Sequence, residues 1–369
     1  MAPEQLYTEA LELLKRLIST QSFSKEEDKT AAIIESFLQS KGIATNRHIN
    51  NVWAVNKYFD KSKPSILLNS HHDTVKPNPQ YTKDPYNPII EDGKLYGLGS
   101  NDAGGCLVSL IATFIHFYDK ENLKYNFVIG ASAEEEISGF NGIEALLNDK
   151  DFIDKTGSAF QPPFRGGGAF AIVGEPTQMN LAIAEKGLMV LDCMSHGKAG
   201  HAAREEGENA IYKAIKDIAW INSYEFPKVS EWLGKVKMSV TVINTENKAH
   251  NVVPAQCSFV VDVRVTDVYS HEAILETIQE NIDSEVKPRS LRMRSTRIDA
   301  DHPIVQSGLA FGKTMYGSPT CSDKALMPFP ALKCGPGDSA RSHTADEFIY
   351  LNEIKDGIVT YIKMIEKIL

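Results

Sequence analysis

Apolar residues in the first half of the chain alternate between helical and strand-like spacing. Apolar side chains recur at helical spacing over 6–18 and 28–41, and Gly42 ends the second segment. Strand-like runs follow at 52–58 and 65–70. The same criteria predict helices over 105–118 and 142–147 and strands over 125–132 and 170–174. Strands that alternate with helices predict an α/β fold whose mostly parallel sheet is covered by helices.

The pattern changes near residue 180. Longer strand patterns and two helical patterns follow, at 187–196, 208–222, 235–245, 256–265 and 270–283. After about residue 292 the α/β character returns, and the chain ends on a predicted helix over 350–368. We therefore predict a discontinuous α/β domain, residues 1–179 and 293–369, with a smaller α+β domain inserted at 180–292. The Pro- and Gly-rich stretch 156–169 is expected to be an exposed loop.

Composition narrows the class of protein. With 42% hydrophobic and 24% charged residues, the 369-residue chain has ordinary globular composition. The net charge of −9 and the lack of a basic run argue against nucleic acid as a partner. An acidic N-terminal segment and no apolar run near 18 residues predict a cytoplasmic protein with no membrane contact. Five scattered cysteines, none in a C-x-x-C pair, favour a reducing compartment and oppose a cysteine zinc site.

Histidine and acidic residues follow several of the predicted strands. His71 and Asp73 come directly after the strand at 65–70. A single histidine there is more often an ordinary loop residue, but a metal-bound imidazole commonly donates its other N–H to a nearby carboxylate. His71 with Asp73 is therefore a candidate metal ligand with its orienting partner.

A glycine-rich run at 97–105 surrounds Asp102. The dinucleotide-binding pattern G-x-G-x-x-G fails here, because Asp102 occupies the third glycine position and would repel an anion. We expect the glycines to let the backbone fold sharply around this one carboxylate.

Three glutamates, 134–136, follow the strand at 125–132, and Glu175 follows the strand at 170–174. His343 comes after a second glycine-rich loop. Adjacent carboxylates at the end of a buried strand raise one another's pKa unless a cation neutralises them. Since open α/β sheets bind ligands at the carboxyl ends of their strands, these groups are expected to meet.

Such a set of imidazoles and carboxylates suits divalent metal ions. Two divalent ions would be balanced by three carboxylates and one hydroxide, which makes the site neutral and tolerable in a partly dry cleft. A water shared by two such ions ionises near neutral pH and attacks a carbonyl. The residues alone thus point to a metal-dependent hydrolase.

In chain order these motifs resemble those of the M20 metallopeptidase family over essentially the whole chain, with acetylornithine deacetylase and succinyl-diaminopimelate desuccinylase as the nearest members. The resemblance implies two divalent metal ions, Zn²⁺ foremost, with Co²⁺ as a substitute. It assigns the metal ligands as His71 and Glu175 for the first ion, Glu136 and His343 for the second, and Asp102 as the bridge. It also makes Glu135 the general base and Asp73 the group that orients His71. The family usually has Asp-Met where this chain has Asp102-Ala103, which leaves the local turn open.

The resemblance also extends to the inserted domain. The segment from Gly197 to His201 resembles the one whose histidine reaches the active site of a partner subunit, so the inserted domain is expected to be a dimerisation, or lid, domain of a homodimer. Asn251 and Arg264 resemble residues that hold the oxyanion side and the substrate carboxylate.

The resemblance implies a hydrolase that removes the acyl group from an N-acyl-L-amino acid, foremost N-acetyl- or N-succinyl-L-ornithine in arginine biosynthesis. The alternatives are succinyl-diaminopimelate desuccinylase, then a dipeptidase or aminoacylase. A different class, an inactive relative that binds a ligand or metal, would be marked by a lost ligand or base, and none is lost.

Overall fold

The structure, a computed structural model, describes residues 3–161 and 169–369. The chain forms two compact units. Unit 1 comprises Met1–Ile183, Ile298–Tyr316 and Ser322–Leu369, and unit 2 comprises Ala184–Arg297 and Gly317–Cys321. The long segment of unit 2 has bounds close to those of the predicted insertion, whereas the short segment lies in a region that the sequence pattern gave to the outer domain.

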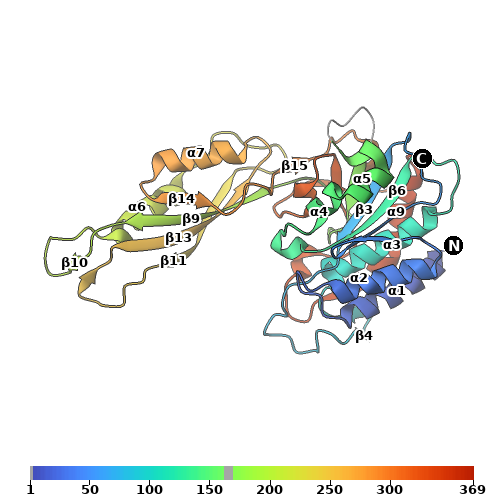
Figure 1. Cartoon of the computed structure of the whole chain (residues 1–369), viewed down its shortest axis with the longest axis horizontal. Coiled ribbons are helices and arrows are strands. Elements are labelled where there is room, and N and C mark those ends of the chain that lie inside the picture. Colours follow the sequence, from blue (N-terminus) through green and yellow to red (C-terminus); the bar gives the residue numbers. More distant parts are fainter. Residues whose placement is uncertain (1–2, 162–168) are drawn as a thin grey trace. The chain divides into compact units, whose positions relative to one another are not determined.

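A large mixed sheet, most of whose strands belong to unit 1, forms the centre of that unit (Figure 1). Its order is β1-β2-β6-β3-β7-β17-β8-β15, and β16 pairs with β8. The strands are β1 (Asn46–His48), β2 (Asn51–Val55), β3 (Ser65–His71), β6 (Asn126–Ser132), β7 (Phe170–Val173), β8 (Leu181–Glu185), β15 (Thr296–Arg297), β16 (Met315–Ser318) and β17 (Ala331–Lys333). The central strands β6, β3, β7 and β17 are parallel, and their pairs with the flanking strands are antiparallel. The predicted mostly parallel sheet is therefore confirmed.

Helices cover both faces of this sheet. They are α1 (Pro3–Ile18), α2 (Asp28–Ser40), α3 (Gly105–Phe117), α4 (Ile143–Asn148), α5 (Lys150–Thr156), α8 (Pro303–Ala310) and α9 (Leu351–Glu366). Helices α1, α3 and α9 pack together on one face, where the Phe117 ring stacks on Phe127 of β6 at 4.7 Å. On the other face α4 and α5 pack against Leu67 and Val128. This two-sided cover explains why every residue of β3, β6 and β7 is buried.

Part of the stretch expected to be an exposed loop belongs to the core. The chain forms a short 3-10 turn at Gly157–Phe160 after α5. Phe160 is buried there and contacts the rings of Phe152 and Phe329. The remainder of the predicted loop, 162–168, lies outside the described residues.

Unit 2 is an antiparallel sheet with helices on one face. Its order is β11-β13-β9-β14, with β9 (Gly187–His196), β11 (Lys237–Asn244), β13 (Gln256–Val265) and β14 (Glu285–Pro288). Burial alternates along β9 and β13, and the buried side packs on α6 (Ala210–Ser223) and α7 (His271–Asn281). A separate two-stranded pair joins β10 (Gly200–His201) to β12 (Val252–Val253).

A small sheet completes the fold. In unit 1, β4 (Ile89–Glu91), β5 (Lys94–Tyr96) and β18 (Phe348–Tyr350) form a three-stranded antiparallel sheet. Within the described ranges, none of the helices combines the length and the apolar character that a membrane span requires.

Candidate metal centre

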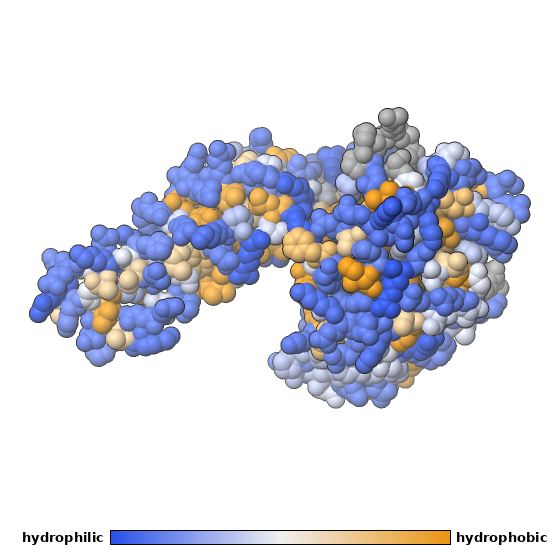
Figure 2. Space-filling view, in the orientation of Figure 1, coloured by the Kyte–Doolittle hydropathy of each residue, from blue (hydrophilic) through white to orange (hydrophobic). Residues whose placement is uncertain are grey.

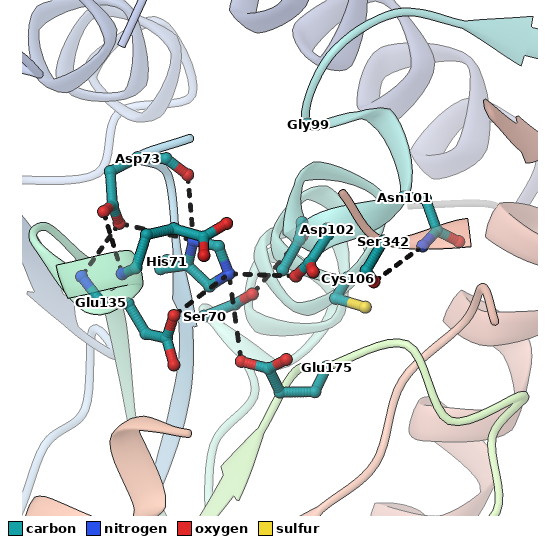
Figure 3. Close-up of polar contacts among 12 residues, drawn as sticks. Ser70, His71, Asp73, Gly99, Asn101, Asp102, Cys106, Glu135, Glu175 and Ser342 are labelled. Carbon is teal, nitrogen blue, oxygen red and sulfur yellow. Dashed lines mark hydrogen bonds and ion pairs between the residues drawn. The ribbon is translucent and has the colours of Figure 1, made fainter. Parts of the chain in front are cut away.

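The predicted ligands of unit 1 meet where the parallel strands end, and Figure 3 shows His71, Asp102 and Glu175 among them. His71 is the last residue of β3, and Glu175 follows β7 by two positions. Glu135 and Glu136 begin a short 3-10 turn, Glu135–Ile137, just after β6. Asp102 lies in the irregular turn that leads into α3. Because β6, β3 and β7 are parallel neighbours, their carboxyl ends bring these side chains together.

Distances in the cluster divide it into two halves that share Asp102. The His71 Nε2 atom lies 3.3 Å from Asp102 Oδ1, 3.9 Å from Glu135 Oε2 and 4.0 Å from Glu175 Oε1. The His343 Nε2 atom lies 3.1 Å from Glu136 Oε2 and 3.7 Å from Asp102 Oδ2. The two oxygens of Asp102 therefore face one histidine each. By distance alone, Glu135 is as close to His71 as Glu175 is.

The donor atoms fit divalent metal ions. His71, Glu135 and Glu175 offer atoms within 4.8 Å of one another, and so do His71, Asp102 and Glu136. All the donors are imidazole nitrogens and carboxylate oxygens, which suit zinc and harder divalent ions. The structure thus brings together every metal ligand predicted in unit 1, together with the predicted base.

Asp73 holds both His71 and the turn that carries the glutamates. The His71 Nδ1 atom is 3.0 Å from the Asp73 carbonyl oxygen and 3.4 Å from its carboxylate. The two carboxylate oxygens accept hydrogen bonds from the backbone N–H groups of Glu135 and Glu136, each at 3.1 Å. Ser24 donates a further bond at 2.7 Å. The orienting role predicted for Asp73 therefore has a contact to support it, and Asp73 also fixes the glutamate turn.

The first of the three consecutive glutamates faces away from the centre. Glu134 has a positive φ of 54°, and its carboxylate accepts a hydrogen bond from the Asn141 amide at 2.8 Å. Its backbone N–H donates to the buried Glu27 at 3.2 Å. This reversal leaves Glu135 and Glu136 directed to the centre. Sequence reasoning missed Glu27, whose place just before α2 is typical of an ordinary helix start.

Glu347 anchors the turn that presents Asp102. Its buried carboxylate accepts hydrogen bonds from the N–H groups of Gly99, Asn101 and Asp102 at 3.1, 2.8 and 2.9 Å. The peptide bond from Asp102 to Ala103 is cis. A Cβ atom at Gly104 would lie 2.4 Å from the Gly99 carbonyl oxygen, so the glycine permits the close approach that the sequence predicted. Glu347 was missed, and its place four residues after His343 was the only signal.

The loop at 77–88 supports His343, which has a φ of +60°. Asn78 donates to the His343 carbonyl oxygen at 3.3 Å. Asp346 accepts bonds from the Thr82 and Lys83 N–H groups, both at 2.9 Å. The sequence identified 77–88 only as a loop, whereas the structure gives it a part in placing a candidate ligand.

Electrostatics in the cluster show a shortage of positive charge. Burial raises the pKa of Glu175 to about 8 and that of Glu347 to about 8. Burial raises the pKa of Glu135 well above its usual range as well. The bond to Glu136 raises the pKa of His343 to about 9. Burial alone would lower the pKa of His71, but Asp102 and Asp73 raise it well above its ordinary value. Protons are retained where divalent cations would otherwise balance the carboxylates.

The remaining predicted residues lie in unit 2. His201 is exposed on β10, and the N–H of Ala202 donates to the Asn251 carbonyl oxygen at 2.9 Å, so His201 and Asn251 are neighbours. Arg264 lies at the opposite end of β13 from Asn251 and forms a two-point ion pair with Asp262, at 2.7 and 3.0 Å. The structure thus places His201 near Asn251, whereas Arg264 lies apart from both.

Comparisons with known proteins show which family the chain and its fold resemble. A succinyl-diaminopimelate desuccinylase from Wolbachia pipientis is 26% identical over 304 residues, which cover 78% of this chain and 72% of the relative. An M20 family metallo-carboxypeptidase from Sulfolobus solfataricus has a TM-score of 0.75 at 16% identity and covers 98% of this chain and 99% of that chain. A dinuclear metal-binding peptidase from Bacillus subtilis has a TM-score of 0.70 at 15% identity, with 99% of both chains covered. The sequence model of peptidase family M20/M25/M40 matches residues 67–367. This chain therefore belongs to peptidase family M20/M25/M40, a family of metallo-hydrolases that act on amide bonds.

Proposed function

We propose that this chain is a di-metal hydrolase that removes the acyl group from an N-acyl-L-amino acid. The observation that carries the proposal is the position of Asp102, whose two carboxylate oxygens face His71 at 3.3 Å and His343 at 3.7 Å. A carboxylate placed between two imidazoles suits a bridge between two ions better than a single-ion site.

The candidate ligands fall into two sets. His71 and Glu175 would hold the first ion, Glu136 and His343 the second, and Asp102 both. Zn²⁺ is the proposed ion and Co²⁺ the substitute, because the donors are imidazole and carboxylate groups. When bound, such a pair polarises the acyl carbonyl and lowers the pKa of a water molecule.

Glu135 is the proposed proton carrier. It would take a proton from the attacking water and deliver it to the leaving amine, which matches the order of steps in general acid–base catalysis. Two features support this role: burial raises the pKa of Glu135, and Asp73 fixes its backbone at 3.1 Å. Since Glu135 and Glu175 are equally close to His71, the assignment needs the variant described in the Discussion.

N-acetyl-L-ornithine and N-succinyl-L-ornithine are the proposed substrates, which would place the reaction in arginine biosynthesis. N-succinyl-diaminopimelate is the second candidate, because several curated relatives are named as its desuccinylase. Purified protein with added Zn²⁺ or Co²⁺ should release free amine from one of the three, and a chelator should abolish the release. Tight metal binding without turnover of any N-acyl amino acid would instead favour the inactive metal-binding relative.

We also propose a cytoplasmic homodimer formed through unit 2. Strand β11 is an edge strand of its sheet, and Val242 and Ile243 on it are exposed. Tyr212 and Ile215 on α6 are exposed as well. Figure 2 shows apolar areas on the largely hydrophilic surface of this unit. In that dimer His201 and Asn251 would act on the oxyanion side of the partner's centre, and Arg264 would hold the substrate carboxylate. Ile243→Lys should yield monomers in light scattering, whereas the exposed Ile49→Lys in unit 1 should not.

A further inference from the structure

Asp323 is a buried carboxylate that the sequence analysis did not select, and it contacts two residues on the strands that lead into the metal centre. It begins a short 3-10 turn, Asp323–Leu326, and only 3% of its surface is exposed. The next residue, Lys324, donates to the carbonyl oxygens of Ala182 and Ile183, both at 3.3 Å. These bonds attach the turn to β8 and so help to fix the position of Asp323, independently of the contacts that Asp323 itself makes.

One oxygen of Asp323 ties together the two strands that carry the centre. Its Oδ2 atom accepts hydrogen bonds from the Asn69 amide at 2.9 Å and from the Ser132 hydroxyl at 2.5 Å. The Asn69 amide also donates to the Ser132 hydroxyl oxygen at 3.2 Å, which closes a triangle. Asn69 precedes His71 by two residues on β3, and Ser132 precedes Glu135 by three residues at the end of β6.

Joining two strands through a buried anion costs free energy, because the charge must be removed from water. Neutral side chains could pair Asn69 with Ser132 without the cost of moving a charge out of water. Asp323 contacts both strands through residues that lie two positions before His71 and three before Glu135, so its negative charge lies near these side chains. A cation bound at the centre would be attracted by this charge.

We propose that Asp323 is a positioning residue for the metal centre, which holds His71 and Glu135 in register through Asn69 and Ser132 and whose charge strengthens metal binding. The inference rests on the proposed metal-dependent function. It concerns neither a ligand nor a group that touches substrate. Partners of metal ligands commonly change metal affinity ~10–100-fold when they are removed.

Asp323→Asn separates the two roles. The asparagine oxygen can still accept both hydrogen bonds, but the charge is lost. We expect Co²⁺ affinity, measured by competition with a chelator, to fall ~10-fold or more. Burial raises the pKa of Asp323 to about 6, so the ionised group disfavours the metal-free fold above that pH. The Tm of the metal-free variant at pH 8 should therefore equal or exceed that of the wild type.

Two further variants complete the test. Ser132→Ala removes one of the bonds, keeps the charge, and should alter the visible absorption spectrum of bound Co²⁺. Asp217→Asn is the matched control, because Asp217 is buried in unit 2 and accepts a bond from the Ser284 hydroxyl at 2.5 Å. It should leave Co²⁺ affinity and spectrum unchanged.

The outcomes distinguish this inference from the proposed function. Unchanged Co²⁺ affinity in Asp323→Asn, or a lower metal-free Tm that accounts for the loss of affinity, would overturn the role of the charge. An unchanged Co²⁺ spectrum in Ser132→Ala would overturn the positioning role. If the wild-type protein itself bound no Co²⁺, the metal-dependent function would fail instead. Because these readouts need no substrate, they do not depend on which N-acyl amino acid is cleaved.

Discussion

Glu347→Gln tests how the fold presents Asp102 to two metal ions. In the native site one oxygen of Glu347 accepts the N–H groups of Asn101 and Asp102, and the other accepts that of Gly99. Glutamine keeps one acceptor oxygen. Its NH₂ group would therefore face either the N–H of Gly99 or the N–H groups of Asn101 and Asp102. At least one of the three hydrogen bonds is lost, and the acceptor in the remaining bonds is no longer charged.

The magnitude follows from these contacts. A hydrogen bond to a charged group contributes ~1.5–3 kcal/mol, and an unpaired buried N–H adds a penalty of similar size. Burial raises the pKa of Glu347 to about 8, so above that pH glutamine also removes a buried charge from the metal-free protein. The two effects oppose each other in the metal-free fold. They do not cancel in metal affinity, which depends on the position of Asp102 and should fall ~10–100-fold, or ~1.4–2.8 kcal/mol.

The assay is a Zn²⁺ competition titration beside urea unfolding of the metal-free protein. Glu272→Gln serves as the control, because Glu272 forms an exposed ion pair with Arg294 in unit 2 and should change neither quantity appreciably. A Zn²⁺ affinity within about twofold of the wild type would refute the reasoning, since it would mean that Asp102 keeps its position without the three bonds.

The remaining predictions concern the proposed catalytic groups. Glu135→Gln should retain metal and lose ~10²–10⁴-fold in kcat, and metal loss measured on the same preparation would make Glu135 a ligand instead. His343→Ala should weaken one metal site in a zinc titration, and an unchanged stoichiometry and affinity would exclude His343 as a ligand. In the metal-free protein the pKa of His343 is raised from 6.5 to about 9, so its bond to Glu136 stabilises fully below pH 6.5 and is lost as pH rises through 9; His343→Ala should remove this dependence of Tm on pH. His201→Ala should lower kcat ~10²–10³-fold and regain activity when its subunits exchange with Glu135→Gln subunits, whereas no recovery after proven exchange would confine His201 to its own chain.

The ligands were predictable because each is signalled locally. His71, Asp102 and Glu175 each follow or precede a regular element, and the parallel order of β3, β6 and β7 then brings the strand ends together. A residue pattern of this kind depends only on the neighbouring sequence.

The supporting residues carry no such signal. Glu27 reads as a helix start, Asp323 as one polar residue in a loop, and Glu347 as part of a charged surface stretch. Each gains its role from bonds to segments far away in the chain: Glu27 bonds to Glu134, and Asp323 bonds to Asn69. Spacing along the sequence contains no information about such contacts, which only the packed fold creates.

The same chemical group therefore serves two purposes in this centre. Carboxylates supply the ligands, and other buried carboxylates hold the backbone N–H and side-chain donors of the segments that bear them, as Asp73 holds the turn of Glu135 and Glu347 holds that of Asp102. The two anions differ in the metal-free fold. Burial raises the pKa of Glu347 to about 8, so its ionised form makes that fold less stable. Burial also acts to raise the pKa of Asp73, but the bonds from His71 and Ser24 hold it below its usual range, so ionised Asp73 stabilises the fold. Because a ligand that binds only the folded state stabilises it by RT ln(1 + [L]/Kd), bound metal should contribute to the stability of unit 1 as well as to its chemistry. A site assembled in this way couples folding to metal binding through its scaffold, and not only through its ligands.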